Sequence, residues 1–169
     1  MSEGPFFGKY RATVDNNVDP DRRGRIRAIV PAVTGKDEPS TWALPCLPAA
    51  GVGMGLFTVP PAGAGVWIEY EGGDPAYPIW VGGYWTEGEV PDLVPTGAPP
   101  AAAFTLQTTN GNGIVVSDER GTGSILIQSA SGAKISIADD GITIDNGRGA
   151  VITMTGPSVD VNDGALKIT

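Results

Sequence analysis

The stretch "ISIADDGITID", residues 135–145, carries an isoleucine at every second position on both sides of a turn. Alternation with a period of two is typical of a β-strand that buries one of its faces. The corner between the two runs, "ADDG", ends in a glycine, which adopts the positive φ that many tight turns require. The stretch therefore predicts a β-hairpin whose two strands direct their isoleucines to the same face.

The same pattern continues through all the residues after 103. Short apolar pairs recur about every nine residues, and every corner between them contains glycine. The predicted strands start near Phe104, Ile114, Ile125, Ile135, Ile142, Val151, Val159 and Leu166. A short and regular period of this kind indicates a fibre or a solenoid rather than a globule.

This segment is too thin to enclose a core by itself. After Phe104 it has no aromatic residue, and single cores below about 70 residues are already marginal. Three chains around one axis would bury the apolar rows against one another. A single-chain solenoid and an up-and-down sandwich remain as alternatives, although a solenoid coil usually takes about 20 residues. The predicted trimer core consists of Ile114, Ile125, Ile127, Ile135, Ile137, Ile142, Ile144, Val159, Val161, Leu166 and Ile168.

The first 85 residues have a different composition and contain all four tryptophans and all four tyrosines. Five strands are predicted there, near residues 9–15, 24–30, 41–44, 66–71 and 79–84, with turn sequences between them. Five short strands with an aromatic core suit a small closed barrel of the OB type. Residues 86–103, "TEGEVPDLVPTGAPPAAA", predict an extended linker. We therefore expect an all-β chain with an OB-fold barrel over residues 1–85, this linker, and an intertwined, triple-stranded β-helix over residues 104–169.

The charge of the chain limits its partners and its location. The 169 residues carry a net charge of −8, with no histidine and one cysteine, Cys46. An acidic surface repels phosphate backbones, so nucleic acid is not an expected partner. We expect the lone thiol to be a small buried apolar group. The N-terminal sequence lacks the apolar core of a signal peptide, and no run is long enough to span a bilayer, which predicts synthesis in the cytoplasm without a signal peptide.

Candidate catalytic groups are few. Without histidine the chain has no imidazole base for a catalytic triad. Three acid pairs fall in turns beside glycine or serine: Asp37/Glu38, Asp118/Glu119 and Asp139/Asp140. The "DNG" and "NDG" corners offer oxygens to Ca²⁺, but turn formation explains them better. We expect no enzymatic activity, no catalytic residue, no cofactor and no metal site.

Four pieces of the first 85 residues together carry a family resemblance: "DPDRRGRIRAIVP" (19–31), "WALP" (42–45), "GLFTVPPAGAGVWIEYEGGDP" (55–75) and "YPIWVGGYW" (77–85). In this order they resemble the OB-fold segment of contractile-tail spike proteins. That family includes phage baseplate spikes, the VgrG proteins of type VI secretion, and the spikes of extracellular contractile injection systems. The repetitive segment resembles the triple-stranded β-helix of the same family, and the resemblance spans nearly all of residues 6–169.

The resemblance implies a structural homotrimer in a phage tail or a contractile injection particle. Such a spike joins the baseplate and the tail tube, and it touches the target membrane only transiently, while puncturing it. Some phage spikes carry a lysozyme domain after the barrel, but the interval of residues 86–103 is too short for an enzyme. Other spikes hold iron at their tip through a His-x-His motif, which a chain without histidine cannot form.

Two further partners follow from the resemblance. A separate hub protein is expected on the barrel side, because the chain lacks the hub domains that precede the barrel in VgrG proteins. A separate PAAR-type tip protein is expected at the C-terminal end. Its predicted seat consists of Val161, Asn162, Asp163, Gly164, Ala165, Leu166, Lys167, Ile168 and Thr169.

One basic cluster stands out in this acidic chain. It consists of Arg22, Arg23, Arg25 and Arg27. Its arginines predict an ion-paired contact with a neighbouring subunit or with the hub, and a solvated strand face is an equally good interpretation.

Two functions of other classes remain as alternatives. An OB-fold module that binds nucleic acid or oligosaccharide would be a monomer with a basic groove, which the acidic charge disfavours. A trimeric receptor-binding fibre would have an enlarged, aromatic distal end, whereas the end of this chain has no aromatic residue.

Overall fold

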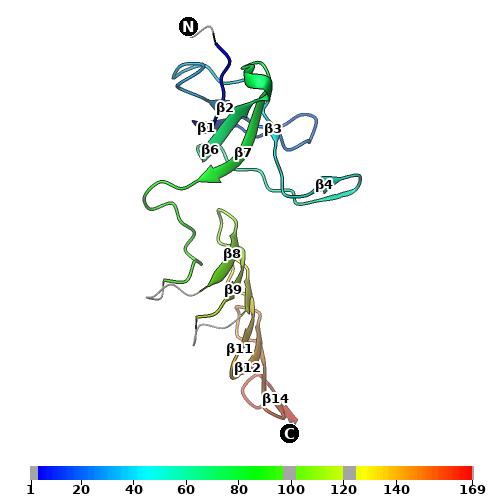
Figure 1. The fold of residues 1–169 in the computed structure, drawn as a ribbon. Coiled ribbons are helices and arrows are strands. Elements are labelled where there is room, and N and C mark those ends of the chain that lie inside the picture. The colour runs from blue at the N-terminus through cyan, green and yellow to red at the C-terminus, as the bar shows by residue number, and fades with distance from the viewer. Residues whose placement is uncertain (1–3, 97–101, 120–124, 169) are drawn as a thin grey trace. The chain divides into compact units, whose positions relative to one another are not determined.

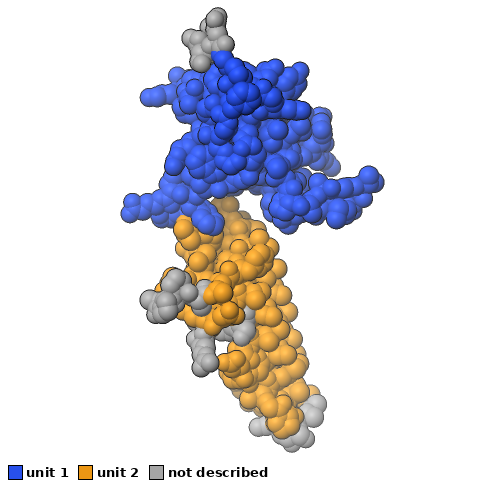
Figure 2. Space-filling view, viewed as in Figure 1, with its two compact units in different colours: residues 1–89 blue, residues 90–169 orange. Residues whose placement is uncertain are grey.

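The structure is a computed structural model that describes residues 4–96, 102–119 and 125–168. The chain divides into two compact units, residues 1–89 and residues 90–169, which Figure 2 shows in blue and orange. The fold is all-β, and the one helical element of the described residues is the single 3₁₀ turn η1 (Glu71–Gly73). Within those residues no helix has the length and apolar character needed to cross a bilayer.

The first unit is a closed five-stranded barrel. Its strands are β1 (Tyr10–Asn16), β2 (Arg27–Ile29), β3 (Leu44–Pro45), β6 (Gly65–Tyr70) and β7 (Pro78–Tyr84). They lie in the order β2-β1-β6-β7-β3, with β3 parallel to β7 and the other pairs antiparallel. A bridge between Ile26 and Ala43 joins the two ends of the sheet. This closed, partly parallel arrangement is that of an OB fold (Figure 1).

The barrel core follows from the alternation along its strands. In β6 every second residue is buried, and Val66 and Ile68 are fully enclosed. Trp80 of β7 fills the interior, and its indole Nε1–H donates a hydrogen bond of 3.0 Å to the carbonyl oxygen of Gly24. A buried indole is tolerated when this donor finds a partner, so the bond fixes the loop before β2 to the core. The other buried apolar residues are Ala12, Val14, Ile26, Ala28, Val30, Ala43 and Tyr70.

The segment between β3 and β6 contains a hairpin that the sequence did not predict. Its strands, β4 (Ala50–Gly51) and β5 (Met54–Gly55), have only two residues each. The sequence around them is "AAGVGMGL", in which no apolar alternation marks a strand. Figure 1 shows this hairpin extending away from the barrel strands of its own unit.

The prediction that Cys46 is buried is wrong, because its side chain is exposed. The main chain at Cys46 runs extended, and its N–H donates to the carbonyl oxygen of Trp80 at 2.9 Å. Successive side chains of an extended segment point to opposite sides. Leu47 therefore packs against the barrel core, and the thiol faces outward.

The second unit is one eight-stranded antiparallel sheet in which every strand pairs with its neighbours in the sequence. Strands are found at all eight predicted places: β8 (Ala103–Gln107), β9 (Gly113–Ser117), β10 (Ile125–Gln128), β11 (Lys134–Ala138), β12 (Gly141–Asp145), β13 (Val151–Thr155), β14 (Ser158–Val161) and β15 (Leu166–Ile168). In Figure 1 they succeed one another from β8 to the C-terminus.

Part of the predicted linker packs on this sheet. The N–H of Leu93 donates to the side-chain oxygen of Gln107 at 2.9 Å. The Leu93 side chain lies over Gly113, where a Cβ atom would come within 2.4 Å of Leu93 Cδ1. Residues 97–101 of the predicted linker lie outside the described residues, and the function of the segment as a linker stays a prediction.

Candidate functional site

The register of the eight-stranded sheet places apolar residues opposite one another from the first strand to the last. Across β11 and β12, for example, Ile135 pairs with Ile144 and Ile137 with Ile142. One column of paired positions is Leu106, Ile114, Ile127, Ile135, Ile144, Ile152, Val161 and Leu166. The other is Phe104, Val116, Ile125, Ile137, Ile142, Met154, Val159 and Ile168. Because paired positions share one face of a sheet, we call this surface the apolar face.

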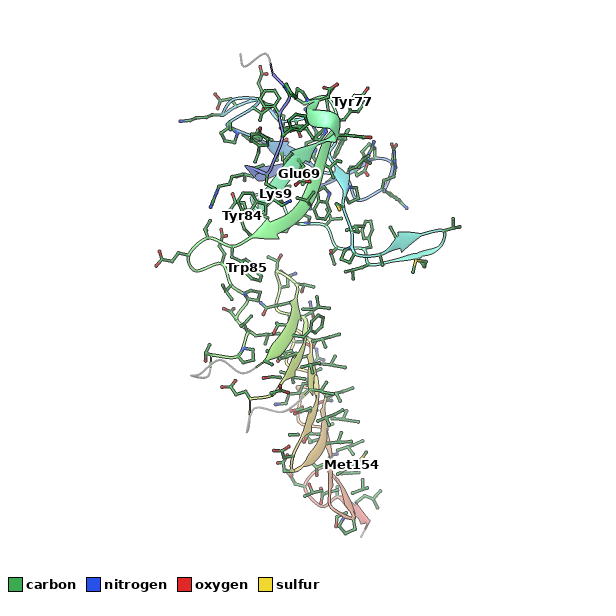
Figure 3. All side chains as sticks on the ribbon, viewed as in Figure 1. Lys9, Glu69, Tyr77, Tyr84, Trp85 and Met154 are labelled. Atoms are coloured by element: carbon green, nitrogen blue, oxygen red, sulfur yellow. The ribbon has the colours of Figure 1, made fainter. Side chains whose placement is uncertain are left out.

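The apolar face is incompletely covered in a single chain. Phe104, Ile127 and Leu166 are each about half exposed, and most of the isoleucines between them are partly exposed. In Figure 3 the side chains of this unit line one side of the ribbon, with Met154 among them. An apolar surface that continues over eight strands is far larger than a soluble monomer usually exposes. The sheet therefore requires a cover.

The opposite face of the sheet has a different character. Its paired positions run through Thr105, Val115, Leu126, Ser136, Thr143, Thr153 and Asp160. The face is polar from Ser136 onward, whereas Val115 near its start is buried. One polar and one apolar face is the usual pattern of an antiparallel sheet that packs on one side only. Among the described residues, the apolar face is the surface of this unit that continues over all eight strands and needs a partner.

All eleven residues of the predicted trimer core occupy register positions on the apolar face. Their role at a trimer axis itself stays a prediction. Five further positions were missed, although their apolar partners across the strands could have indicated them. These are Phe104, Leu106, Val116, Ile152 and Met154.

The four arginines of the barrel's basic cluster fall into two pairs with different environments. The guanidinium of Arg25 donates to Asp19 Oδ1 from Nε at 3.1 Å and from Nη2 at 2.6 Å, and to Asp21 Oδ2 at 2.6 Å. It also lies over the ring of Trp42, 5.5 Å from the centroid. Arg27 donates to the carbonyl oxygen of Ser40 at 3.1 Å. The side chains of these two arginines are therefore engaged in hydrogen bonds within their own barrel.

Asp19 is the centre of this arrangement. Besides Arg25, its carboxylate accepts hydrogen bonds from the backbone N–H groups of Asp21 and Arg23. The side-chain hydrogen bonds from Arg25, together with these backbone donors, hold the pKa of Asp19 well below its ordinary value of 3.8. The loop is thereby fixed in one conformation, in which Arg22 takes a positive φ of 53°.

Arg22 and Arg23 differ from the other two arginines. Both are exposed, and neither side chain forms an ion pair with another described residue. They border a groove of about 410 Å³ whose other wall is the β4–β5 hairpin, including Met54 and Phe57. Of the four arginines predicted to contact a partner, these two are available for it.

Comparison with protein families decides what the two units are. Residues 10–85 match the model of the type VI secretion system/phage-baseplate injector OB domain, and residues 103–167 match the phage baseplate V C-terminal trimerisation domain. The chain belongs to the baseplate spike family. No curated protein matches the spike. The trimerisation match falls on the sheet with the apolar face, so the spike is a homotrimer that associates with a baseplate as part of a phage tail or a related particle.

The C-terminal end of the spike is closed by a tight hairpin. Asn162 and Asp163 both have a φ of 51°, and the Asn162 side-chain oxygen accepts the N–H of Val151 at 2.9 Å. The Asp160 carboxylate accepts the N–H of Gly164 at 2.8 Å. These corner oxygens thus serve the turn, and the described residues contain no cluster of metal-binding side chains. The predicted tip seat lies on this hairpin, except for Thr169, which is outside the described residues.

Proposed function

We propose that the spike is the central spike of a contractile injection machine. It sits on the baseplate hub at the end of the tail tube and punctures the target envelope when the sheath contracts. The observation that carries this proposal is the unbroken apolar face, two residues wide on every strand, in the part of the chain that matches a trimerisation domain. Three such faces, turned inward, form a dry axis with polar residues outside.

A spike that punctures an envelope needs stiffness along its axis. Eight strands at a spacing of about 4.8 Å give a hydrogen-bonded rod on the order of 40 Å long. Each chain pairs its eight strands internally rather than exchanging strands along the sheet, and in this proposal the three chains meet through their apolar faces. Dry packing between stacked strands is the feature that makes cross-β assemblies hard to unfold. A chain can leave the rod only by exposing its whole apolar face. Dissociation of a single chain from the rod is therefore rare.

The two ends of the spike have different tasks in this proposal. The barrel seats the rod on a separate hub protein. The C-terminal hairpin, residues 161–169, receives a PAAR-type tip protein. Support for the second assignment comes from β15, the last strand of the sheet, which within the described part of the chain pairs only with β14. A free strand edge is a ready site for main-chain hydrogen bonds from another protein.

Particle assembly tests the proposed function. Particles are produced with wild-type spike, with Ile144→Asp on the apolar face, or with Thr143→Asp, its matched control on the opposite face. We expect wild-type and Thr143→Asp particles to carry the spike at the end of the tube and to permeabilise target cells. Ile144→Asp particles should lack the spike and leave target cells intact. Full permeabilisation by spike-free particles would contradict the puncturing role.

The tip seat needs a test of its own. Deletion of "NDGALKIT", residues 162–169, should abolish co-purification of a PAAR-type tip protein while the trimer persists. Undiminished binding of the tip protein to the truncated trimer would place its seat elsewhere.

A further inference from the structure

The β4–β5 hairpin presents a second apolar surface, on the barrel unit. Met54 is 63% exposed and Phe57 is 68% exposed, and Val52 at the turn is fully exposed. The hairpin has two residues per strand and is extended by a bond of 3.0 Å from the N–H of Leu56 to the carbonyl oxygen of Ala49. A hairpin this short is not stable by itself in water. It therefore needs support from another surface.

The base of the hairpin is joined to the arginine loop. A Cβ atom on Gly24 would meet the ring of Phe57 at 3.3 Å, so this ring lies directly over the loop. The Asp19–Arg25 ion pair holds the same loop and leaves the side chains of Arg22 and Arg23 exposed. The groove of about 410 Å³ between loop and hairpin thus combines two free cations with exposed apolar side chains. Its occupant should be acidic and apolar.

The turn after β7 is a surface of that chemistry on the barrel unit. The N–H of Thr86 donates to Glu89 Oε2 at 2.6 Å, and the N–H of Glu89 donates back to the carbonyl oxygen of Thr86 at 3.2 Å. This turn holds Glu87 exposed beside Trp85, which is 65% exposed and labelled in Figure 3. In Figure 1 the chain after β7 and the β4–β5 hairpin leave the barrel on different sides, so the turn does not fill the groove of its own chain.

We propose that the groove between the arginine loop and the β4–β5 hairpin receives Trp85 and Glu87 of a neighbouring subunit in the trimer. The trimerisation domain holds three copies together, which raises the local concentration of each barrel for its neighbours. In a cyclic trimer each subunit gives one surface and accepts another, so one groove and one acidic turn per barrel suffice for three contacts. Opposite charges fix the register, and the indole covers the apolar hairpin. The barrels thereby form a ring of their own, a contact beyond the proposed puncturing function.

Cross-linking in the full-length trimer tests the contact. In a Cys46→Ser background, Met54→Cys and Glu87→Cys are combined and treated with a short bis-maleimide. We expect covalent dimers and trimers on a denaturing gel. A control pairs Glu87→Cys with Tyr77→Cys, which is 60% exposed and lies in Figure 3 away from the hairpin. Monomer bands alone, or equal cross-linking in the control, would overturn the proposal.

A charge reversal with rescue provides an independent readout. Arg23→Glu should increase the hydrogen-exchange rates of the amides of residues 50–57 severalfold, while light scattering still gives a trimer. Adding Glu87→Arg should restore the slow exchange, because the ion pair is re-formed with opposite polarity. Lys36→Glu, the same charge change on an exposed lysine, should have no effect. The neighbour contact would be overturned if Arg23→Glu left the exchange rates of residues 50–57 unchanged. It would also be overturned if these amides were protected only after hub-containing baseplates are added.

Discussion

Ile135 lies directly opposite Ile144 across β11 and β12, and the two side chains are 40% and 39% exposed within one chain. A cross-strand pair of this kind normally lies in a core. Here it is one step of a ladder that continues through all eight strands, and within the described residues the ladder stays partly exposed. We propose that three identical apolar faces cover one another in the homotrimer.

Ile144→Asp tests the burial of this ladder. Three-fold symmetry would bring three carboxylates into a dry core, where an unpaired charge costs several kcal/mol. We expect the variant to be monomeric or aggregated in size-exclusion chromatography with light scattering. Thr143→Asp, one residue away on the polar face, should assemble normally. A stable Ile144→Asp trimer would show that this column faces away from the axis.

Asp19→Asn tests the ion pair that fixes the arginine loop. Because the folded barrel lowers the pKa of Asp19, its carboxylate stabilises the fold fully above the ordinary pKa of 3.8, and this stabilisation is lost as the pH falls below that value. Asp19→Asn should lower the melting temperature of the barrel by several degrees at pH 7. The difference between wild type and variant should shrink as the pH falls below about 4.

Tryptophan fluorescence is the measurement for this effect, since all four tryptophans lie in the barrel unit. Thermal unfolding is followed between pH 3 and pH 7 for both proteins. A difference in melting temperature that does not change with pH would mean that the charge of Asp19 does not stabilise the barrel.

Gly141→Ala tests the close approach of β12 and β13. Gly141 has a φ of 143°, and a Cβ atom there would lie 1.9 Å from the carbonyl oxygen of Met154. The strands would have to separate, so we expect a loss of about 3 kcal/mol or more per chain and a reduced yield of trimer. Gly111→Ala is the control, because Gly111 has a φ of 84° but open space around it, and it should cost only about 1–2 kcal/mol. Circular dichroism melts of the two variants that coincide would contradict the steric argument.

The sequence predicted the eight strands of the second unit because their pattern is simple. Ile135, Ile137, Ile142 and Ile144 alternate strictly, and a glycine lies in each corner. Strand positions and the apolar face therefore follow from period and turn chemistry. The barrel strands were also predicted, since their alternation and aromatic residues mark them. Pattern alone left the topology of the barrel open, and the family resemblance supported the OB fold.

Three features of the barrel could not be predicted in the same way. The β4–β5 hairpin lacks alternation, because strands of two residues leave no periodic signal. Cys46 was misplaced because its exposure depends on which side of an extended segment faces the barrel. The Asp19–Arg25 ion pair forms only through the geometry of the loop, which composition does not reveal. The sequence therefore could not distinguish Arg25 from the exposed Arg22 and Arg23.

The most direct test of the account is the mass of the full-length protein in solution. Light scattering should give about 52 kDa, three chains of 17.4 kDa, and the mass should persist on dilution through the micromolar range. A folded, soluble species of 17.4 kDa with its eight-stranded sheet intact would contradict the account, because the apolar face would then be stable without its two sister faces.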